Sequence, residues 1–387
     1  MVPNGWKLST IEEISNVSSG GTPSRKNDSY WNGSIPWVTT AEVQYKVIED
    51  TAEKITAEGL AGSSAKLFPA GTILMAMYGQ GKTRGQVAKL GIEASTNQAC
   101  AAIVLHPGYV VDYYYQFLVS QYENIREMAN SGSQENLSGG IVKSIQVPVP
   151  PLSEQQKIAK ILTAWDKAIT TTEQLLANSR QQKKALMQQL LTGKKRLLDD
   201  NRVRFSGEWK YLTFDETFKI ANKKSSQVKS SEFLEAGLIP IVDQSQKLIA
   251  GYCNIEIPYS DLPVIVFGDH TRCVKWVDFV FCPGADGTQV LKTSGHIEAK
   301  FGYYLLCNKD IPNLGYSRHM RELKEKDFKA PLMHEEQKKI ATVLSVADEE
   351  VNALEQKTEH LKQEKKALMQ QLLTGKRRVK TDKKEVA

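Results

Sequence analysis

The chain has 387 residues, of which 41% are hydrophobic and 24% charged, and its formal net charge is +6. These proportions are ordinary for a folded protein and exclude wholesale disorder, and at roughly 100–200 residues per domain the length predicts two or three domains. The net charge permits binding to nucleic acid but does not require it.

The sequence shows no segment suited to a membrane. Its longest apolar runs, Leu262–Phe267 and Ala99–Leu105, are far shorter than the roughly 20 residues of a membrane-spanning helix. The first residues lack the basic-then-apolar pattern of a secretory signal. The five cysteines have no CxxC spacing, which favours a reduced protein without disulfides. We therefore expect a cytoplasmic protein that does not contact a membrane.

Residues 1–150 are expected to form a first globular domain. Thr72–Met77 and Ala101–Leu105 have the composition of strands, and Val111–Met128 that of a helix. This mixture predicts an α/β (α+β) fold.

Residues 151–196 are expected to form one long helix. Prolines at positions 148, 150 and 151 exclude helix before it, Ser153 with Gln156 is the pattern of a capping box, and Gly193 stands where a glycine ends a helix. Its apolar side chains recur at steps of four and three residues, as in a coiled coil. The predicted seam residues of this helix are Ile158, Leu162, Trp165, Ile169, Leu176, Leu186 and Leu190.

A linker at residues 197–206 leads to a second globular block at residues 207–332. Pro263–Phe267, Val277–Phe281 and Gln289–Leu291 have the composition of strands, and Ala299–Cys307 that of a helix. The second block is therefore also predicted to be α/β, although its sequence differs from that of the first.

Residues 333–376 repeat the long helix, and residues 377–387 are expected to form a basic flexible tail. The sequence KKALMQQLLTGK occurs at Lys183–Lys194 and again at Lys365–Lys376. Lys183 and Lys365 interrupt the two seams, and a polar seam residue can fix helix register. The predicted seam residues of the second helix are Ile340, Leu344, Val351, Leu354, Leu361, Leu368 and Leu372.

Two like helices and two unlike globular domains suggest one scaffold that carries two different readers. If the helices pair antiparallel as a coiled coil, the chain acquires a pseudo-two-fold axis, which matches the symmetry of duplex DNA. The alternative is a coiled coil that only holds two domains apart or joins two chains.

Both globular blocks contain polar and basic segments suited to DNA. Arg and Lys suit guanine edges and phosphates, Asn and Gln suit adenine, and Ser and Thr serve either purpose. The candidate DNA contacts are Thr22, Ser24, Arg25, Lys26, Thr39, Thr40, Lys82, Thr83, Arg84, Asn97 and Gln98 in the first block, and Lys223, Lys224, Ser225, Gln227, Lys229, Asp269, His270, Thr271, Arg272, Lys275, Arg318, His319 and Arg321 in the second. A basic loop that is merely solvated is the competing interpretation of each.

Patterns of catalytic and metal sites are incomplete in this sequence. Gly81-Lys82-Thr83 resembles the end of a phosphate-binding loop, but Ala76 stands where that motif requires glycine. His270, Cys273 and Cys282 do not have the spacing of a zinc finger. No histidine lies in the sequence context of a nucleophile elbow. We expect no catalytic residue, metal or cofactor in this chain.

Several motifs resemble those of the specificity subunit of Type I restriction-modification systems. They are Gly20-Gly21-Thr22-Pro23-Ser24 followed by Ile35-Pro36-Trp37-Val38, Ser95-Thr96-Asn97-Gln98-Ala99, Gly132-Ser133-Gln134-Glu135-Asn136-Leu137, and the run from Val147 to Ala159 that joins a proline-rich exit to the first helix. The second block departs from the pattern, because Ala330–Gln337 is a shortened version of that run and Arg318-His319-Met320 replaces the Gln-Glu-Asn segment.

The resemblance implies a non-catalytic DNA-binding subunit. Its two globular domains would be target recognition domains for a bipartite, asymmetric site, and its helices would dock two methyltransferase (modification) subunits. S-adenosylmethionine for adenine methylation, and ATP and Mg for cleavage by restriction subunits, would bind to those partners. A stand-alone DNA-binding regulator and a structural coiled-coil scaffold are the alternatives from the residues alone.

Overall fold

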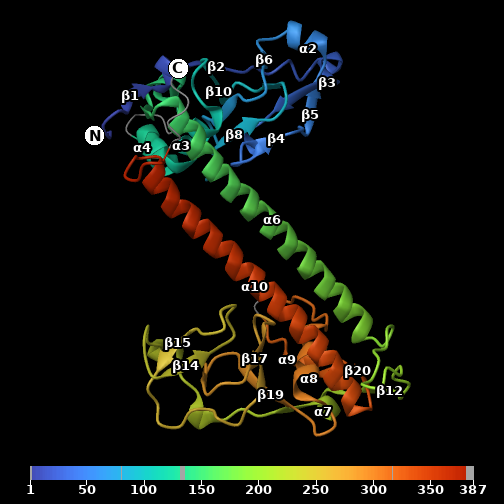
Figure 1. The fold of residues 1–387 in the computed structure, drawn as a ribbon. Coiled ribbons are helices and arrows are strands. Elements are labelled where there is room, and N and C mark those ends of the chain that lie inside the picture. Colours follow the sequence, from blue (N-terminus) through green and yellow to red (C-terminus); the bar gives the residue numbers. More distant parts are fainter. Residues whose placement is uncertain (1, 80, 131–135, 316, 381–387) are drawn as a thin grey trace. The chain divides into compact units, whose positions relative to one another are not determined.

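The computed structural model describes residues 2–79, 81–130, 136–315 and 317–380. The chain forms two compact units (Figure 1): unit 1 comprises Met1–Thr172 and Lys357–Ala387, and unit 2 comprises Glu173–Gln356. The boundary between the units crosses both long helices. Each unit therefore contains one globular block and about half of each helix.

Unit 1 contains two larger sheets and one short ribbon. The five-stranded sheet has the order β2 (Ser15–Ser19), β10 (Cys100–Leu105), β7 (Ile73–Ala76), β8 (Val87–Leu90) and β4 (Val47–Ile48). The four-stranded sheet has the order β5 (Glu53–Ile55), β3 (Trp31–Val38), β9 (Ala94–Thr96) and β6 (Leu67–Phe68). The ribbon pairs β1 (Lys7–Thr10) with β11 (Gln146–Val149) in antiparallel fashion.

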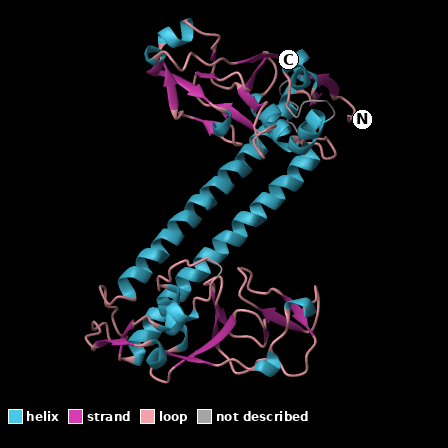
Figure 2. Cartoon of the chain, turned by 180° about the vertical axis from the view of Figure 1, so that it is seen from behind, coloured by secondary structure: helices cyan, strands magenta, loops and turns pink. Residues whose placement is uncertain are grey.

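Successive side chains along the strands of the five-stranded sheet point to two different cores, and this alternation explains the layers of unit 1. In β7, Ile73 and Met75 join a core shared with the helices, whereas Leu74 and Ala76 join a core with Val38 and other residues of the second sheet. Because successive side chains of a strand point to opposite faces, this sheet is buried on both sides. Helices cover one face and the second sheet covers the other (Figure 2).

The short helices of unit 1 differ in one place from the sequence prediction. They are α1 (Ile11–Ile14), α2 (Ala57–Ala61), α3 (Val111–Ser120), α4 (Tyr122–Asn130) and α5 (Gly139–Ser144), with 3₁₀ turns η1 (Asp28–Tyr30) and η2 (Thr40–Glu42). The helix predicted at Val111–Met128 is two helices, because Gln121 ends α3 and its N–H bonds to the carbonyls of Phe117 and Leu118.

Unit 2 repeats this layered plan. Its larger sheet has the order β13 (Phe218–Ile220), β19 (Thr288–Thr293), β16 (Val264–Gly268) and β17 (Val274–Val277), and its smaller sheet has the order β15 (Gly251–Cys253), β14 (Ile239–Val242) and β18 (Cys282–Pro283). The ribbon pairs β12 (Trp209–Leu212) with β20 (Phe328–Pro331). The remaining short elements are α7 (Phe214–Thr217), η3 (Lys224–Ser226), η4 (Ser230–Glu232), α8 (Ala299–Cys307) and α9 (Met320–Lys324).

The strands of unit 2 show the same two-sided burial. Ile265 and Phe267 of β16 pack with the helices, and Val264 and Val266 pack on the opposite face with Val242. The strand predicted at Val277–Phe281 is wrong. Val277 ends β17, and Phe281 makes only an isolated bridge to Tyr259 before β18 begins.

The two long helices are α6 (Leu152–Leu190) and α10 (His334–Leu372). Helix α6 begins at Leu152, so Ser153 lies inside its first turn and does not serve as the predicted cap. Gly193 and Gly375 follow the helices with φ of 71° and 70°, a left-handed conformation that favours glycine, as predicted. All fourteen predicted seam residues are buried or half-buried.

In each unit α6 and α10 pack together in opposite directions. In unit 1 the Arg378 guanidinium pairs with Glu154 (Nε–Oε2 2.8 Å) and Lys365 pairs with Asp166 (2.6 Å). In unit 2 Arg196 pairs with Glu336 (Nη2–Oε2 2.7 Å) and Lys183 pairs with Asp348. Each pair of unit 2 repeats a pair of unit 1 at positions 182 residues apart in the sequence. The two seam lysines are therefore satisfied by aspartates of the opposite helix.

The ends of the seams lie in the cores of the globular blocks. Ile158 and Leu162 share a core with Met369 and Leu372 in unit 1, and Ile340 and Leu344 share one with Leu190 in unit 2. Each block is thus packed on the start of one long helix and the end of the other. Residues 381–387 of the predicted tail lie outside the described residues.

Candidate nucleic-acid interface

The carboxyl ends of two parallel strands bring polar residues together in unit 1. Strands β3 and β9 run parallel, with Val38 opposite Thr96 as their last pair. Thr39 and Thr40 follow β3, and Asn97 and Gln98 follow β9. The Asn97 N–H donates to the Val38 carbonyl at 3.1 Å, which holds the segment after β9 against the end of β3.

A glycine pair places a third segment on the same edge. The Gly21 N–H donates to the Thr96 carbonyl at 2.8 Å. A Cβ on Gly20 would lie 1.9 Å from the Thr96 oxygen, so this close approach requires glycine. The Thr22 hydroxyl then donates to Gln98 Oε1. We call Thr22, Thr39, Thr40, Asn97 and Gln98 the unit 1 polar edge.

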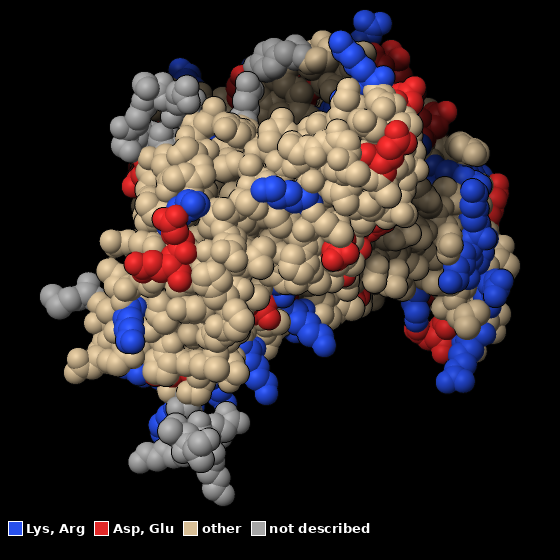
Figure 3. All heavy atoms as spheres, turned by 90° about the horizontal axis from the view of Figure 1, so that it is seen from above, with Lys and Arg blue, Asp and Glu red and all other residues tan. Residues whose placement is uncertain are grey.

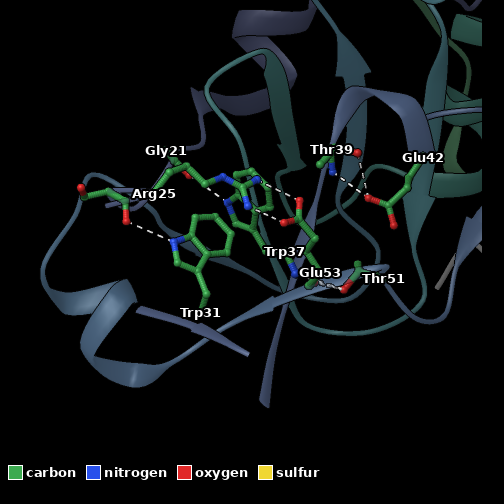
Figure 4. A network of polar contacts seen from close by, with 9 residues as sticks. Gly21, Arg25, Trp31, Trp37, Thr39, Glu42, Thr51 and Glu53 are labelled. Atoms are coloured by element: carbon green, nitrogen blue, oxygen red, sulfur yellow. Dashed lines mark hydrogen bonds and ion pairs between the residues drawn. The ribbon is translucent and has the colours of Figure 1, made fainter. Parts of the chain in front are cut away.

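Arg25 is held beside this edge by an aromatic and acidic cluster (Figure 4). Its guanidinium lies 3.7 Å from the centroid of the Trp31 ring and bonds to both oxygens of Glu53, with Nη2–Oε2 at 2.9 Å. The Trp31 indole donates to the Ser24 carbonyl at 3.1 Å, and the Trp37 indole to the Gly21 carbonyl at 3.0 Å. The hydrogen bond from Arg25 lowers the pKa of the Glu53 carboxyl.

The loop between β7 and β8 is tied to α4. The Tyr122 hydroxyl donates to the Lys82 carbonyl at 2.6 Å, and Arg126 donates to the Gly81 carbonyl at 2.8 Å. Lys82 itself is exposed. Sequence reasoning did not select Tyr122 or Arg126, because both lie on a helix and not in a basic loop.

Unit 2 has a polar edge at the corresponding place. Strand β14 runs parallel to β18, with Val242 opposite Pro283, and Gln244 and Gln246 follow β14. The turn between β16 and β17 lies against this segment, since the His270 N–H donates to Gln244 Oε1 at 3.1 Å and the Thr271 hydroxyl to the Gln244 carbonyl at 2.5 Å.

Arg318 follows Ser317, whose carbonyl lies 3.2 Å from His270 Nδ1. We call Gln244, Gln246, His270, Thr271 and Arg318 the unit 2 polar edge. Sequence reasoning missed Gln244 and Gln246. The signal available for them was the polar run Asp-Gln-Ser-Gln-Lys directly after an apolar strand, as Asn97-Gln98 follows another.

Comparison with known proteins shows a similarity over the first half of the chain. Residues 3–178 match the family model of the Type I restriction modification DNA specificity domain. The Type I restriction enzyme MjaIX specificity subunit of Methanocaldococcus jannaschii is 33% identical over 173 residues, which cover 43% of this chain and 39% of that protein. Residues 3–178 are therefore similar to the DNA specificity domain of Type I restriction-modification systems.

Two further known proteins are similar to this chain. The EcoR124I/EcoR124II specificity subunit of Escherichia coli is 32% identical over 167 residues, 42% of this chain and 40% of that protein. The aligned stretches thus span about two fifths of these two relatives. The crystal structure of the S subunit of a Type I restriction-modification system from M. genitalium has the same fold, with a TM-score of 0.65 and 16% identity over 96% of this chain and 98% of that one.

Four of the predicted DNA contacts are buried in the structure. They are Arg84, Asp269, Lys275 and His319, all at most 9% exposed. The Asp269 carboxylate accepts the N–H of Met320 at 2.7 Å, and His319 lies 2.8 Å from the Asp269 carbonyl. These contacts anchor α9, which explains why an acidic and an aromatic polar residue are buried there.

Lys275 also serves the fold. Its ammonium donates to the Asp243 carbonyl at 2.7 Å and to the Lys247 carbonyl, and burial lowers its pKa. It holds the segment after β14 against β17.

The other predicted contacts lie on the surface or are half-buried. Exposed are Ser24, Arg25, Lys26, Lys82, Gln98, Lys223, Lys224, Ser225, Lys229, Thr271, Arg318 and Arg321; half-buried are Thr22, Thr39, Thr40, Thr83, Asn97, Gln227, His270 and Arg272. Thr39 forms a capping box with Glu42, and Arg272 donates to the Ile311 carbonyl at 2.8 Å. On the face drawn in Figure 3, basic and acidic side chains are interspersed over largely uncharged surface.

The described residues contain neither a membrane-spanning helix nor a cluster of metal ligands. None of the described helices is long and apolar enough to span a membrane. Within the same ranges, no three His, Cys, Asp or Glu side chains are grouped so that they could hold a metal ion.

Proposed function

We propose that this chain is the DNA-reading subunit of a Type I restriction-modification complex, with one target recognition domain in each unit. The observation that carries the proposal is the recurrence of a polar edge at the end of a parallel strand pair in both units. The residues of the two edges differ, so the two units would read different sequences. Together they would recognise a bipartite, asymmetric site with a non-specific spacer.

The long helices would set the spacer between the two half-sites. Their antiparallel packing within each unit supports a pseudo-two-fold arrangement, in which the readers face DNA in opposite senses. The domains would then be residues 1–150 and 207–332 for the readers, 151–196 and 333–376 for the helices, 197–206 for the linker and 377–387 for the tail.

The repeated helix ends support docking of two copies of one partner. Lys184, Ala185, Gln188 and Gln189 are exposed, and so are their sequence equivalents Lys366, Ala367, Gln370 and Gln371. Packing of the helices against two different globular blocks would not require these exposed residues to be identical. Identical exposed residues are explained if each helix end contacts the same surface of a methyltransferase subunit.

Catalysis would belong to those partners and not to this chain. The methyltransferase subunits would bind S-adenosylmethionine and methylate adenine, and restriction subunits would use ATP and Mg for cleavage. The complex would act on cytoplasmic DNA, with steep salt dependence because reading loops also contact phosphates.

The test is to co-produce the chain with the methyltransferase subunit encoded beside it and to map methylated adenines in the host DNA. We expect one bipartite sequence with an adenine modified on each strand. Methylation at a continuous site would contradict the two-reader model. Tight sequence-specific binding without any methylation would favour a stand-alone regulator, and no retention on DNA at low salt would favour a scaffold.

A further inference from the structure

We infer that Gln98 and Gln244 are base-reading residues, one in each unit, and that the protein orients both side chains so that their Nε2 amines face the DNA. This inference rests on the proposed function and adds to it the chemistry of one base contact per half-site. Both glutamines lie at the polar edges defined above.

In unit 2 the orientation of the amide follows from its partner. Gln244 Oε1 accepts the backbone N–H of His270 at 3.1 Å. A backbone N–H only donates, so the oxygen and not the amine of the Gln244 side chain must face it. Gly287, with φ of 61°, leaves space for this contact, because a Cβ there would lie 2.5 Å from Gln244 Oε1.

In unit 1 the Thr22 hydroxyl has the corresponding role. It donates to Gln98 Oε1, and the Gly20-Gly21 backbone that carries it is bonded to the end of β9. The neighbouring Asn97 is half-buried, and its Oδ1 accepts the N–H of Ala99 at 3.1 Å within its own turn. Gln98 is exposed.

The amine group of each glutamine remains available within the described part of the chain. Among the described residues, neither Gln98 Nε2 nor Gln244 Nε2 donates a hydrogen bond to the protein. The same arrangement thus arises twice, from a threonine hydroxyl in one unit and a backbone amide in the other. An amide with its oxygen held inward presents N–H donors outward.

The outward donors favour one base over the others. Guanine presents two acceptors, N7 and O6, in the major groove, whereas adenine presents an acceptor beside a donor, cytosine presents a donor, and thymine presents the single acceptor O4 beside its methyl group. A glutamine usually reads adenine with both its oxygen and its amine, but here the oxygen is engaged with the protein. We therefore expect guanine at the base contacted by Gln98 and at the base contacted by Gln244.

The test uses the full chain in complex with its methyltransferase subunits and a DNA library randomised over both half-sites. Gln98→Glu keeps an oxygen for Thr22 but turns the outward donor into an acceptor. We expect guanine to be replaced by cytosine at one position of one half-site, with a preference change of roughly 10- to 100-fold. Gln244→Glu, which keeps the oxygen for His270, should do the same in the other half-site only.

A second variant tests whether the orientation of the Gln98 side-chain amide, and not only its presence, determines the preferred base. Thr22→Val removes the hydroxyl and releases Gln98 Oε1, so adenine should be accepted beside guanine at the same position. Gln146→Glu, at an exposed glutamine of β11 on the ribbon, is the matched control and should leave every position unchanged.

The outcomes distinguish this inference from the function on which it rests. If the wild-type complex shows no bipartite specificity, the proposed function fails. If the wild type is specific but Gln98→Glu and Gln244→Glu leave the preferred bases unchanged, or both change the same half-site, the inference fails alone. If both variants and Gln98→Ala lose binding to all sequences equally, the glutamines have a structural role, which also overturns the inference.

Discussion

The guanidinium of Arg25 shows how one side chain can fix a whole loop. Its flat face stacks on Trp31 while its N–H groups bond to Glu53, and Trp31 in turn donates to the Ser24 carbonyl. Stacking and a two-point ion pair use the planar shape of arginine, which lysine cannot supply. The loop that carries Ser24 and Lys26 is therefore held beside the unit 1 polar edge by Arg25, whose charge is already matched within the protein.

Replacing Arg25 with methionine should raise the pKa of Glu53 toward the ordinary glutamate range. The Arg25 hydrogen bond lowers that pKa in the folded state, so it stabilises the fold above the pKa of the unfolded chain, and this stabilisation is lost as the pH falls through the folded pKa. The stability difference between wild type and Arg25→Met should thus shrink on acidification. NMR titration of the Glu53 carboxyl measures the shift. Lys54→Met, which removes the partner of Asp50, is the control and should leave Glu53 unchanged.

At the scale of elements, the sequence predicts the long helices, whose apolar pattern repeats many times, better than it predicts where short strands and helices end. The two long helices follow from seam residues at steps of four and three and from glycines at their ends, and α6 begins one residue before the predicted cap. The strand expected at Val277–Phe281 failed because a five-residue run with four apolar side chains does not determine where a strand stops pairing with its neighbour. The helix expected at Val111–Met128 failed because periodicity continues through the break at Gln121.

The candidate site was predictable in part for a related reason. Sequence reasoning selects exposed basic and amide residues by type, and it placed Thr22, Thr39, Asn97 and Gln98 in one set that the structure brings to one edge. It could not distinguish Asp269 from a surface residue, because only the folded chain shows that its carboxylate holds the start of α9.

The paired seam lysines should couple the long helices more strongly than exposed ion pairs do. Lys183 and Asp348 are 27% and 25% exposed, and the Tyr304 hydroxyl also donates to Asp348 at 2.6 Å. A double-mutant cycle with Lys183→Met and Asp348→Asn, followed by urea unfolding, should give a coupling free energy of about 1 kcal/mol. The matched pair Arg180–Glu355, which is 58% and 43% exposed, should give clearly less. Equal couplings would show that burial does not strengthen the seam pair.

At the scale of the whole molecule, the structure contains a second repeat that the sequence hides. The sequence repeats only its helices, yet both globular blocks place a two-sided sheet between helices and a smaller sheet. Apolar alternation is enough to specify those layers, so the blocks keep the fold while their surface residues differ. The polar contacts at the helix ends, Glu154 with Arg378 and Glu336 with Arg196, recur with the helices. One scaffold built twice with two different edges is what a reader of two unlike half-sites requires.

Lengthening both long helices together should change the spacer and nothing else in the recognised site. Gln174 and Gln356 are sequence equivalents on α6 and α10, and four helix-forming residues inserted after each would add roughly 6 Å to the pair. At 3.4 Å per base pair this corresponds to about two base pairs of spacer. Mapping methylated adenines in cells that produce the variant complex measures the spacer, and the same insertion after Asn201, outside both helices, should leave it unchanged. Neither insertion touches the reading edges, so the half-site bases should stay the same. Altered half-site bases, or an unaltered spacer in the helix variant, would contradict the role of the helices in setting the distance between the half-sites.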